Sequence, residues 1–460
     1  MKPSRRQILK ALGSGMAWSL THPLVPGVAF ARSESNLSAA DNLLFLIRVI
    51  GGWDVLMSTD ARDFEALRGR GLSPSEFYYC NARQPLRQIE GALIGQALKP
   101  LVPYLQDVAI INGMMMIHDS PSHEVNRSYM ASGSTENERE GFAPFQLARA
   151  LAESGLAPRV SYRMGLEALY DGGYPRSIAL ESIRKLIEPS KTDDLQHTLE
   201  NKARLDKRPG SLSRALDLAE RDKMALELLP TLGREIRGRN LSDTQMDGIN
   251  LSLAGLATGY AQMALCDFSV NLDTHDEHER QHLPELQRTM EAVAKTIATL
   301  KRTPFRGGKD PQKRMLWDVT TVVVMSEFSR SCWEQGGVGR DGTNHNQYDN
   351  SVILAGRGIQ GGRVIGRSEI FTNAELNIIG APSQLMAIPF DFKTNRALTT
   401  EEFHALTASG SIAKCRGTTG NCVDYIYPET LWRTLLPLFN VADIRSLGEG
   451  PVLSSLVKSL

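Results

Sequence analysis

Five short apolar runs along the chain predict buried β-strands. They cover residues 43–50, 108–115, 266–272, 319–325 and 351–355. Each run is short for a helix, and a nearly continuous apolar sequence is typical of parallel strands that are buried on both faces. Because helical patterns fall between the runs, the sequence predicts an α/β fold with a mostly parallel central sheet and helices on both faces.

Two helical regions differ in character. Within 286–300, apolar residues recur at intervals of three and four, which places one apolar stripe on a helix that packs against the sheet. The segment 185–262 is mainly helical and polar, and it separates the second and third predicted strands by a long path. We predict that it is a helical insertion on the sheet, within a single domain of residues 32–460. A separate helical domain is the alternative.

Polar side chains that are suited to ligand binding follow each of the first four apolar runs. In open α/β sheets, ligands bind at the carboxyl ends of the strands. We therefore expect these side chains to converge on one edge of the sheet. They are Asp54 after the first run; His118, Asp119, Ser120, Ser122 and His123 after the second; Asp273, His275, Asp276 and His278 after the third; and Ser326, Glu327, Arg330, Asn344 and His345 after the fourth.

Two of these residues are candidate metal ligands from their spacing, and Asp54 is a candidate for contact with a ligand. Asp273 and His275 stand two positions apart, and in an extended segment both side chains point to the same side, as ligands of one metal must. Asp54 follows Gly51 and Gly52, a pair that permits a sharp turn and a close approach to a ligand. The structural alternatives are a polar turn for Asp273 and His275, and a helix cap for Asp54.

Ser122 is the candidate nucleophile. It precedes a helical segment, and a helix N-terminus stabilises an alkoxide or a bound anion. The same position also suits a serine that only caps the helix, and Ser120 is the competing nucleophile. Arg330 is the candidate for holding an anionic substrate, with Arg127 as its rival. A structural salt bridge with Glu327 is the alternative role of Arg330.

Three other features are interpreted as structural. The methionine run at 114–116 lies at the end of a predicted strand and is expected to pack in the core. His278 and His282 share one face of a helix, but charged residues surround them, so we expect both to be solvated. His404 lies in a polar helical segment and is expected at the surface.

The first 31 residues are organised as an export signal. Arg5 and Arg6 lie in a basic start, and an apolar stretch follows that ends in Ala29, Phe30 and Ala31. This pattern predicts a twin-arginine signal peptide. We therefore expect the translocation machinery of that route as a partner and a periplasmic or extracellular mature protein. No later apolar run reaches 18 residues, so no membrane span is expected after signal removal.

Composition and charge narrow the class of protein further. The chain of 460 residues has 52 Lys plus Arg against 52 Asp plus Glu, and 42% of its residues are hydrophobic. These values are typical of a globular protein, and the balanced charge argues against nucleic-acid binding. The five cysteines cannot all pair within one monomer. Cys415 and Cys422 bracket a turn-like segment and are the predicted local disulfide, whereas Cys266 is predicted to be a small buried side chain.

Together these features resemble domain-of-unknown-function family 1501. The resemblance covers residues 42–366 and includes the twin-arginine start. The family looks like a distant branch of the alkaline phosphatase superfamily, which includes the sulfatases. The motifs that carry the resemblance are Gly51-Gly52-Trp53-Asp54, Ser122-His123, Asp273-Thr274-His275, Ser326-Glu327-Phe328-Ser329-Arg330 and Gly342-Thr343-Asn344-His345.

The resemblance implies an alkaline-phosphatase-like fold and a metal-dependent hydrolase with Ser122 as its nucleophile. Asn344 stands where the family usually has an aspartate, which removes a charge from the second metal site. The spacing of the aspartate and histidine is also shorter than in the superfamily, and no distal histidine ligand is evident. We therefore expect one or two divalent ions, of zinc, manganese or calcium. The implied metal ligands are Asp54, Asp273, His275, Asn344 and His345.

These observations lead to a functional hypothesis with two competitors. The chain is predicted to be an exported, metal-dependent hydrolase that acts on small anionic phosphate or sulfate esters. The first alternative is a non-catalytic secreted binding or assembly protein that kept the fold, which the uncharged Asn344 favours. The second is a scaffold with a single structural metal.

Overall fold

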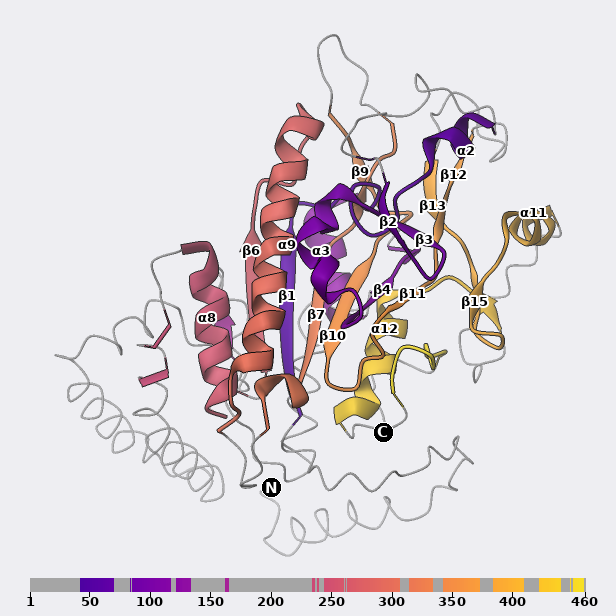
Figure 1. Cartoon of the computed structure of the whole chain (residues 1–460). Helices are drawn as coiled ribbons and strands as arrows, with labels where there is room; N and C mark the ends of the chain where they lie inside the picture. The colour runs from indigo at the N-terminus through magenta and orange to yellow at the C-terminus, as the bar shows by residue number, and fades with distance from the viewer. Residues whose placement is uncertain are drawn as a thin grey trace, which may run out of the picture. The chain divides into compact units, whose positions relative to one another are not determined.

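A seven-stranded sheet forms the centre of the described part of the chain (Figure 1). From one edge to the other, its strands are β11 (Arg363–Ile365), β4 (Val108–Ile111), β10 (Val352–Gly356), β7 (Thr320–Ser326), β1 (Leu43–Ile50), β6 (Met263–Ser269) and β5 (Tyr162–Met164). β10 runs antiparallel to both of its neighbours, and every other neighbouring pair in this sheet is parallel. The prediction of an α/β fold with a mostly parallel sheet is therefore confirmed.

The computed structural model describes much of the chain between residues 42 and 458. The described residues are 42–69, 83, 85–116, 121–133, 162–164, 234–235, 238–239, 244–259, 261, 263–306, 314–333, 342–372, 384–408, 422–439, 447 and 450–458. All of them belong to one unit, Leu37–Lys458. The expected signal peptide and the larger part of the expected insertion lie outside the described residues, so both stay predictions.

The five apolar runs correspond to five strands of this sheet. The run at 43–50 is β1 residue for residue, and β7 and β10 each begin one residue later than predicted. β4 stops at Ile111 because Gly113 has a φ of +67° and packs so closely on the carbonyl oxygen of Arg367 that a side chain would overlap it. β6 begins three residues before the predicted run. β5 and β11 were not predicted, because a strand of three residues is too short to show a recognisable pattern of apolar positions.

Helices and short 3₁₀ turns surround the sheet. The α-helices are α2 (Phe64–Gly69), α3 (His123–Ser132), α8 (Thr244–Ala257), α9 (His278–Arg302), α11 (Thr400–Ala408) and α12 (Pro428–Leu435). The 3₁₀ helices are η4 (Gln96–Tyr104), η5 (Leu316–Asp318) and η6 (Leu436–Phe439). α8 falls within the predicted insertion and packs against β6.

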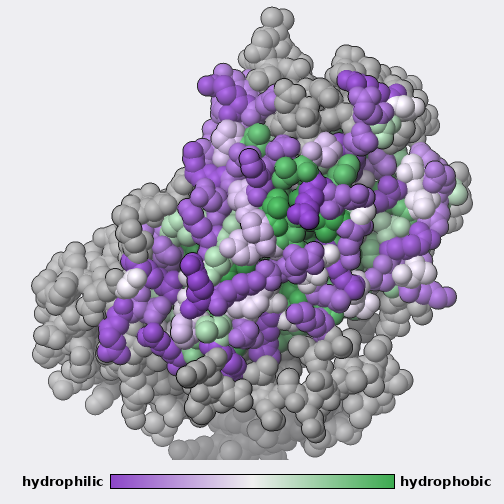
Figure 2. Space-filling view, in the orientation of Figure 1, coloured by the Kyte–Doolittle hydropathy of each residue, from purple (hydrophilic) through white to green (hydrophobic). Residues whose placement is uncertain are grey.

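The sheet is covered on both faces because alternate side chains of β1 point to opposite sides. Phe45 and Ile47 belong to one buried cluster, together with residues of η4, α8 and α9. Leu44 and Leu46 belong to a second buried cluster, together with residues of α3, α12 and η6. The outer side of α9 carries mainly hydrophilic residues (Figure 2), as its apolar stripe requires.

Four small sheets complete the described part. They are β2 (Pro85–Ile89) with β3 (Ala92–Gly95); β8 (Ser329–Arg330) with β9 (His345–Asn346); β12 (Ser368–Phe371) with β13 (Gln384–Ala387); and β14 (Phe390–Asp391) with β15 (Arg396–Ala397) and β16 (Val423–Asp424). The β8–β9 pair matters most here, because it sets Arg330 opposite His345 at the carboxyl end of β7.

The methionine and cysteine predictions can be compared with this core. The methionine run at 114–116 is buried, which confirms core packing. Cys266 is buried with a free thiol, and burial raises its pKa to about 12. Cys422 is disulfide-bonded, while Cys415 lies outside the described residues. His404 is half-buried on α11 beside Phe371, so it is less exposed than expected.

Candidate metal centre

Three histidines and one aspartate meet beside the carboxyl ends of β6 and β7. The Nε2 atom of His345 lies 3.0 Å from Nε2 of His123 and 3.2 Å from Nε2 of His275. Oδ1 of Asp273 lies between 3.0 and 3.3 Å from all three nitrogens. We call these four residues the His–Asp group. Their side chains are 16% to 45% exposed, so a solvent ion can reach them.

Three elements place the four members of the group. Asp273 and His275 follow the end of β6, His123 is the first residue of α3, and His345 lies on β9. Two glycines bring these segments into contact. A Cβ on Gly51 would lie 2.8 Å from the backbone nitrogen of Asp273, and a Cβ on Gly342 would overlap the carbonyl oxygen of His275.

Hydrogen bonds on the far side of two imidazoles set their tautomers. Nδ1 of His123 lies 2.8 Å from Oε1 of Glu327, and Nδ1 of His345 lies 2.7 Å from the carbonyl oxygen of Pro121. A carboxylate and a carbonyl only accept hydrogen bonds, so both Nδ1 atoms carry the proton. A ring that carries its proton on Nδ1 presents the lone pair of Nε2, and here the Nε2 atoms face each other. This outer-shell arrangement is the one that metal-binding histidines normally have.

The donor set fits a divalent cation. Two Nε2 lone pairs and a carboxylate oxygen at about 3 Å repel one another unless a positive charge lies among them. Ligands of a tetrahedral ion with bonds of about 2.0–2.1 Å stand about 3.3 Å apart, close to the separations among His123, Asp273 and His345, whose ligand atoms all lie within 4.8 Å of one another. Histidine nitrogen with one carboxylate oxygen is a ligand set of zinc and other transition metals.

Nearby charges and burial keep Asp273 and His345 in the protonation states that bind metal. Partial burial raises the pKa of Asp273, but Arg330 and His123 outweigh it and lower that pKa to about 2. Burial lowers the pKa of His345 below its ordinary value. At neutral pH, Asp273 is therefore a carboxylate and the ring of His345 is uncharged, which are the states that bind metal.

Arg330 supports Asp273 from the interior. Its side chain is fully buried, and Nη1 donates to Oδ1 of Asp273 at 3.0 Å. Nε and Nη2 donate to the hydroxyl and the carbonyl oxygen of Thr343. The structural alternative, a salt bridge between Arg330 and Glu327, is absent from the described ion pairs. Arg330 lies behind the His–Asp group and holds its carboxylate in place.

Asp54, a predicted metal ligand, is not brought to the His–Asp group. Its side chain is fully buried, and Oδ2 accepts hydrogen bonds from Arg83 at 2.8 Å and 3.0 Å and lies 2.8 Å from Nε2 of His278. Oδ1 accepts the backbone N–H of Leu56 at 2.8 Å. Burial acts to raise the pKa of Asp54, but Arg83 and His278 hold it below the ordinary range.

The prediction that His278 and His282 are solvated was wrong, because both side chains are fully buried. Nε2 of His282 accepts the backbone N–H of Asp54 at 2.9 Å, and Nδ1 of His278 lies 2.6 Å from the hydroxyl of Thr274. The two histidines continue the apolar stripe of α9 at four-residue spacing toward Leu286. That spacing was the sequence signal for burial, and the charged neighbours masked it.

Other predicted site residues lie at the edge of the group. Ser122 is exposed at the N-cap of α3, and its side chain does not bond to the first-turn N–H groups. The side-chain oxygen of Asn344 accepts the backbone N–H of His345 at 2.8 Å. Ser120 lies outside the described residues. Sequence reasoning did not assign His123 as a ligand, although it follows Ser122 directly, and Arg83 carried no recognisable signal.

Comparison with known proteins begins with the family. Residues 256–379 match the model of a family described as protein of unknown function (DUF1501). This segment contains Asp273, His275 and His345 but not His123. A comparison with curated proteins finds no match.

Among solved structures, the chain is similar to the lipoteichoic acid synthase LtaP from Listeria monocytogenes. The sequences are 10% identical, and the alignment covers 74% of this chain and 72% of that chain, with a TM-score of 0.34.

Proposed function

We propose that the chain is a metal-dependent hydrolase of phosphate or sulfate esters, with the His–Asp group as its metal site. The observation that supports this proposal is the convergence of three Nε2 atoms and Oδ1 of Asp273. A divalent cation held there would polarise an ester oxygen as a Lewis acid. Three nitrogen ligands favour zinc over manganese and calcium, which prefer oxygen ligands.

The protein's own residues have separate roles in this proposal. Arg330 fixes the carboxylate of Asp273, and Glu327 fixes the ring of His123, so that the ligand atoms are in place before an ion binds. Ser122 supplies the nucleophile. Its exposure and its position directly before His123 support that role, because a helix N-terminus stabilises a developing alkoxide.

A second candidate function is favoured by the ion pair between Asp54 and Arg83. Hydrolases with two metals use both ions to stabilise the attacking and leaving oxygens. With Asp54 committed to Arg83 and His278, the described residues offer one group of ligands rather than two. A secreted, non-catalytic protein with a single metal ion is therefore the alternative.

Export belongs to the proposal as well. No described helix is long and apolar enough to cross a membrane. The basic start with Arg5 and Arg6, followed by the apolar stretch to Ala31, supports twin-arginine export and a periplasmic or extracellular location. The proposed substrate is a small anionic ester.

Elemental analysis of the protein, purified without chelator, tests the metal site. We expect one equivalent of a divalent metal in the wild type and none in an Asp273→Ala, His275→Ala variant, because two of four ligand atoms are lost. Ser122→Ala should keep the metal and lose ester turnover. His404→Ala, on α11, is the matched histidine control and should keep both. A metal-free wild type would contradict the proposal, and a metal-bound wild type without turnover would favour the binding protein.

A further inference from the structure

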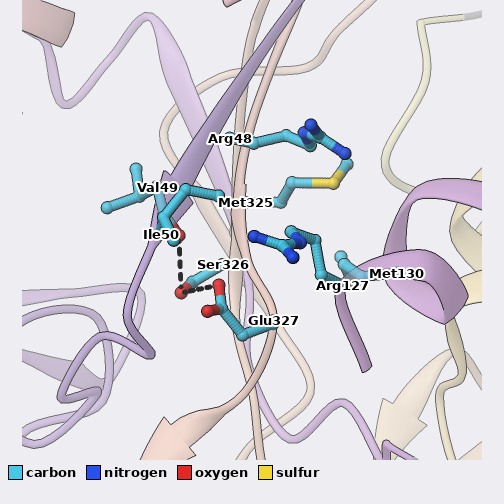
Figure 3. A pocket seen from close by; sticks show the side chains of 8 residues that line it. All are labelled: Arg48, Val49, Ile50, Arg127, Met130, Met325, Ser326 and Glu327. Atoms are coloured by element: carbon cyan, nitrogen blue, oxygen red, sulfur yellow. Dashed lines mark hydrogen bonds between the residues drawn. The ribbon is translucent and has the colours of Figure 1, made fainter. Parts of the chain in front are cut away.

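Two ligands of the His–Asp group are held from behind by charged side chains. Glu327 orients the ring of His123 at 2.8 Å and itself accepts the hydroxyl of Ser326 (Figure 3). Arg330 donates to the carboxylate of Asp273 at 3.0 Å. Support of this kind sets the direction of a ligand before an ion arrives. The loop that carries Asp273 has a further support, which acts on the uncharged side chain beside it.

Thr274 lies between the two ligands of this loop, Asp273 and His275. Its side chain is buried, whereas the side chains of Asp273 and His275 are 45% and 39% exposed. The preceding Leu272 is buried as well, so burial alternates along the loop as it does along an extended segment. Successive side chains of such a segment point to opposite sides. The inward direction of Thr274 is therefore tied to the outward direction of both ligands.

Two histidines of α9 hold the hydroxyl of Thr274. Nδ1 of His278 lies 2.6 Å from this hydroxyl oxygen, and Nδ1 of His282 lies 3.0 Å from it. The two histidines are four residues apart, so they lie on one face of the helix. Both rings are fully buried, where hydrogen bonds are stronger than in water. We call His278, Thr274 and His282 the α9 clamp.

The hydrogen bonds of the α9 clamp have a defined direction. Nε2 of His282 accepts the backbone N–H of Asp54, so the proton of this ring is on Nδ1 and is donated to Thr274. Nε2 of His278 faces the carboxylate of Asp54, so this ring carries its proton on Nε2. Burial lowers the pKa of His278 to about 4, so the ring is uncharged and its Nδ1 atom accepts the hydroxyl proton of Thr274.

The backbone of Thr274 is held as well. Its carbonyl oxygen accepts the N–H of Thr343 at 3.2 Å, and the hydroxyl of Thr343 lies 3.1 Å from Nδ1 of His278. Nε of Arg330 donates to the same hydroxyl at 3.0 Å. The α9 clamp is therefore continuous with the arginine that holds Asp273. The loop would have to break several buried hydrogen bonds in order to turn.

We propose that Thr274 is a positioning residue of the metal centre. By holding its hydroxyl inward, the α9 clamp directs Asp273 and His275 toward one ion before that ion binds. This inference rests on the proposed function, because it requires that the His–Asp group binds a divalent cation. Without the hydroxyl, the buried N–H of His282 loses its acceptor, and the loop gains freedom to turn at the expense of metal binding.

Binding of cobalt(II) to the purified protein, measured by its visible absorption, tests the positioning role. Thr274→Val keeps the shape of the side chain and removes the hydroxyl, so affinity should fall at least about tenfold and the spectrum should change with the ligand geometry. Thr274→Ser keeps the hydroxyl and should restore the spectrum. The matched control is Thr296→Val, which removes a buried hydroxyl that donates to the carbonyl oxygen of Ala292 on the same helix. It should bind as the wild type does.

Histidine-selective NMR of the metal-free protein tests the α9 clamp independently of any ion. We expect His282 to be the Nδ1–H tautomer and His278 to be the Nε2–H tautomer. The variant His282→Gln removes the signals of one ring and so assigns them. The same tautomer in both rings would overturn the clamp.

The outcomes separate this inference from the proposed function. Cobalt binding that Thr274→Val leaves unchanged overturns the positioning role, while the metal site stands. A loss in Thr274→Ser or in Thr296→Val as large as that in Thr274→Val overturns it as well, because the loss would not follow the hydroxyl of Thr274. A wild type that binds no cobalt overturns both the metal site and its positioning. Cobalt binding without ester turnover contradicts the proposed hydrolase alone.

Discussion

At the scale of single residues, the least expected feature is a pair of uncharged histidines, His278 and His282, beneath the His–Asp group. His278 contacts Asp54, Thr274 and Thr343, and His282 contacts the backbone of Asp54 and Thr274. Burial lowers the pKa of His278 to about 4, against the hydrogen bond to Asp54, which raises it. Burial, with the neighbouring His278, also lowers the pKa of His282 well below its ordinary value. Both rings act as neutral hydrogen-bonding groups.

These shifts predict a loss of stability in mild acid. Between pH 6.5 and about 4 the unfolded chain binds a proton at each of these histidines, whereas the folded chain does not. The free energy of unfolding should therefore fall as the pH falls through this range, by up to about 1.4 kcal/mol per pH unit for each histidine. Urea unfolding in the presence of chelator, from pH 4.5 to 8, measures this slope.

A pair of variants assigns the slope to its source. His282→Gln removes one titrating group. The slope of the unfolding free energy against pH should therefore decrease by the contribution of one proton, up to about 1.4 kcal/mol per pH unit. Ile297 is buried on the same helix, α9, and Ile297→Val should lower stability without changing the slope. An unchanged slope in His282→Gln would show that another group takes up the proton.

At the scale of elements, the site depends on the close approach of two loops. The loop before β9 carries Gly342 and leads into His345, the first residue of β9, and the loop after β6 carries His275. Gly342 lies directly against the carbonyl oxygen of His275, where a Cβ has no room. The backbone N–H of Thr343 also donates to the carbonyl oxygen of Thr274 at 3.2 Å, which joins the same two loops.

Gly342→Ala should therefore separate the two loops and weaken the metal site. We expect metal affinity to fall at least about tenfold, the size of effect that supporting residues of metal sites usually have. Competition with a chromogenic chelator measures the affinity. Gly69→Ala, at the end of α2, meets no neighbouring atom and should leave affinity unchanged. If Gly342→Ala bound metal with wild-type affinity, the two loops would accommodate a Cβ at this position without disturbing the metal site.

The strands could be predicted from the sequence because a central strand is buried on both faces and so reads as a continuous apolar run. β1 is the clearest case. The polar residues after β6 and β7 could be predicted by the same argument, and Asp273, His275 and His345 do meet. The role of Asp54 could not be predicted, since its partner Arg83 is distant in the fold's pattern of strands and lies in an unremarkable stretch of sequence. Pairing of that kind depends on tertiary packing.

At the scale of the whole molecule, the His–Asp group links distant parts of the chain. His123, Asp273 and His345 come from α3, the end of β6 and β9, and no ligand set of this kind exists in an unfolded chain. A bound ion should therefore stabilise the folded state by mass action, by about 2.7 kcal/mol when free metal is a hundred times its dissociation constant.

Thermal unfolding with and without added metal measures this stabilisation. The melting temperature of the wild type, stripped of metal, should rise with metal concentration. The Asp273→Ala, His275→Ala variant should show no such rise. An equal rise in both proteins would place the stabilising ion elsewhere in the chain.

The reversed direction of β10 has a consequence for the biosynthesis of the protein. Because β10 runs against its neighbours, the segment that leads into it arrives at the edge of the sheet where β6 and β7 end, and His345 arrives with it. A nascent chain that has not yet reached β10 contains His123, Asp273 and His275 but lacks the strand that brings in His345. If the His–Asp group binds an ion as proposed, capture of that ion would be a late event in translation, and a bound ion would report that β10 has joined the sheet.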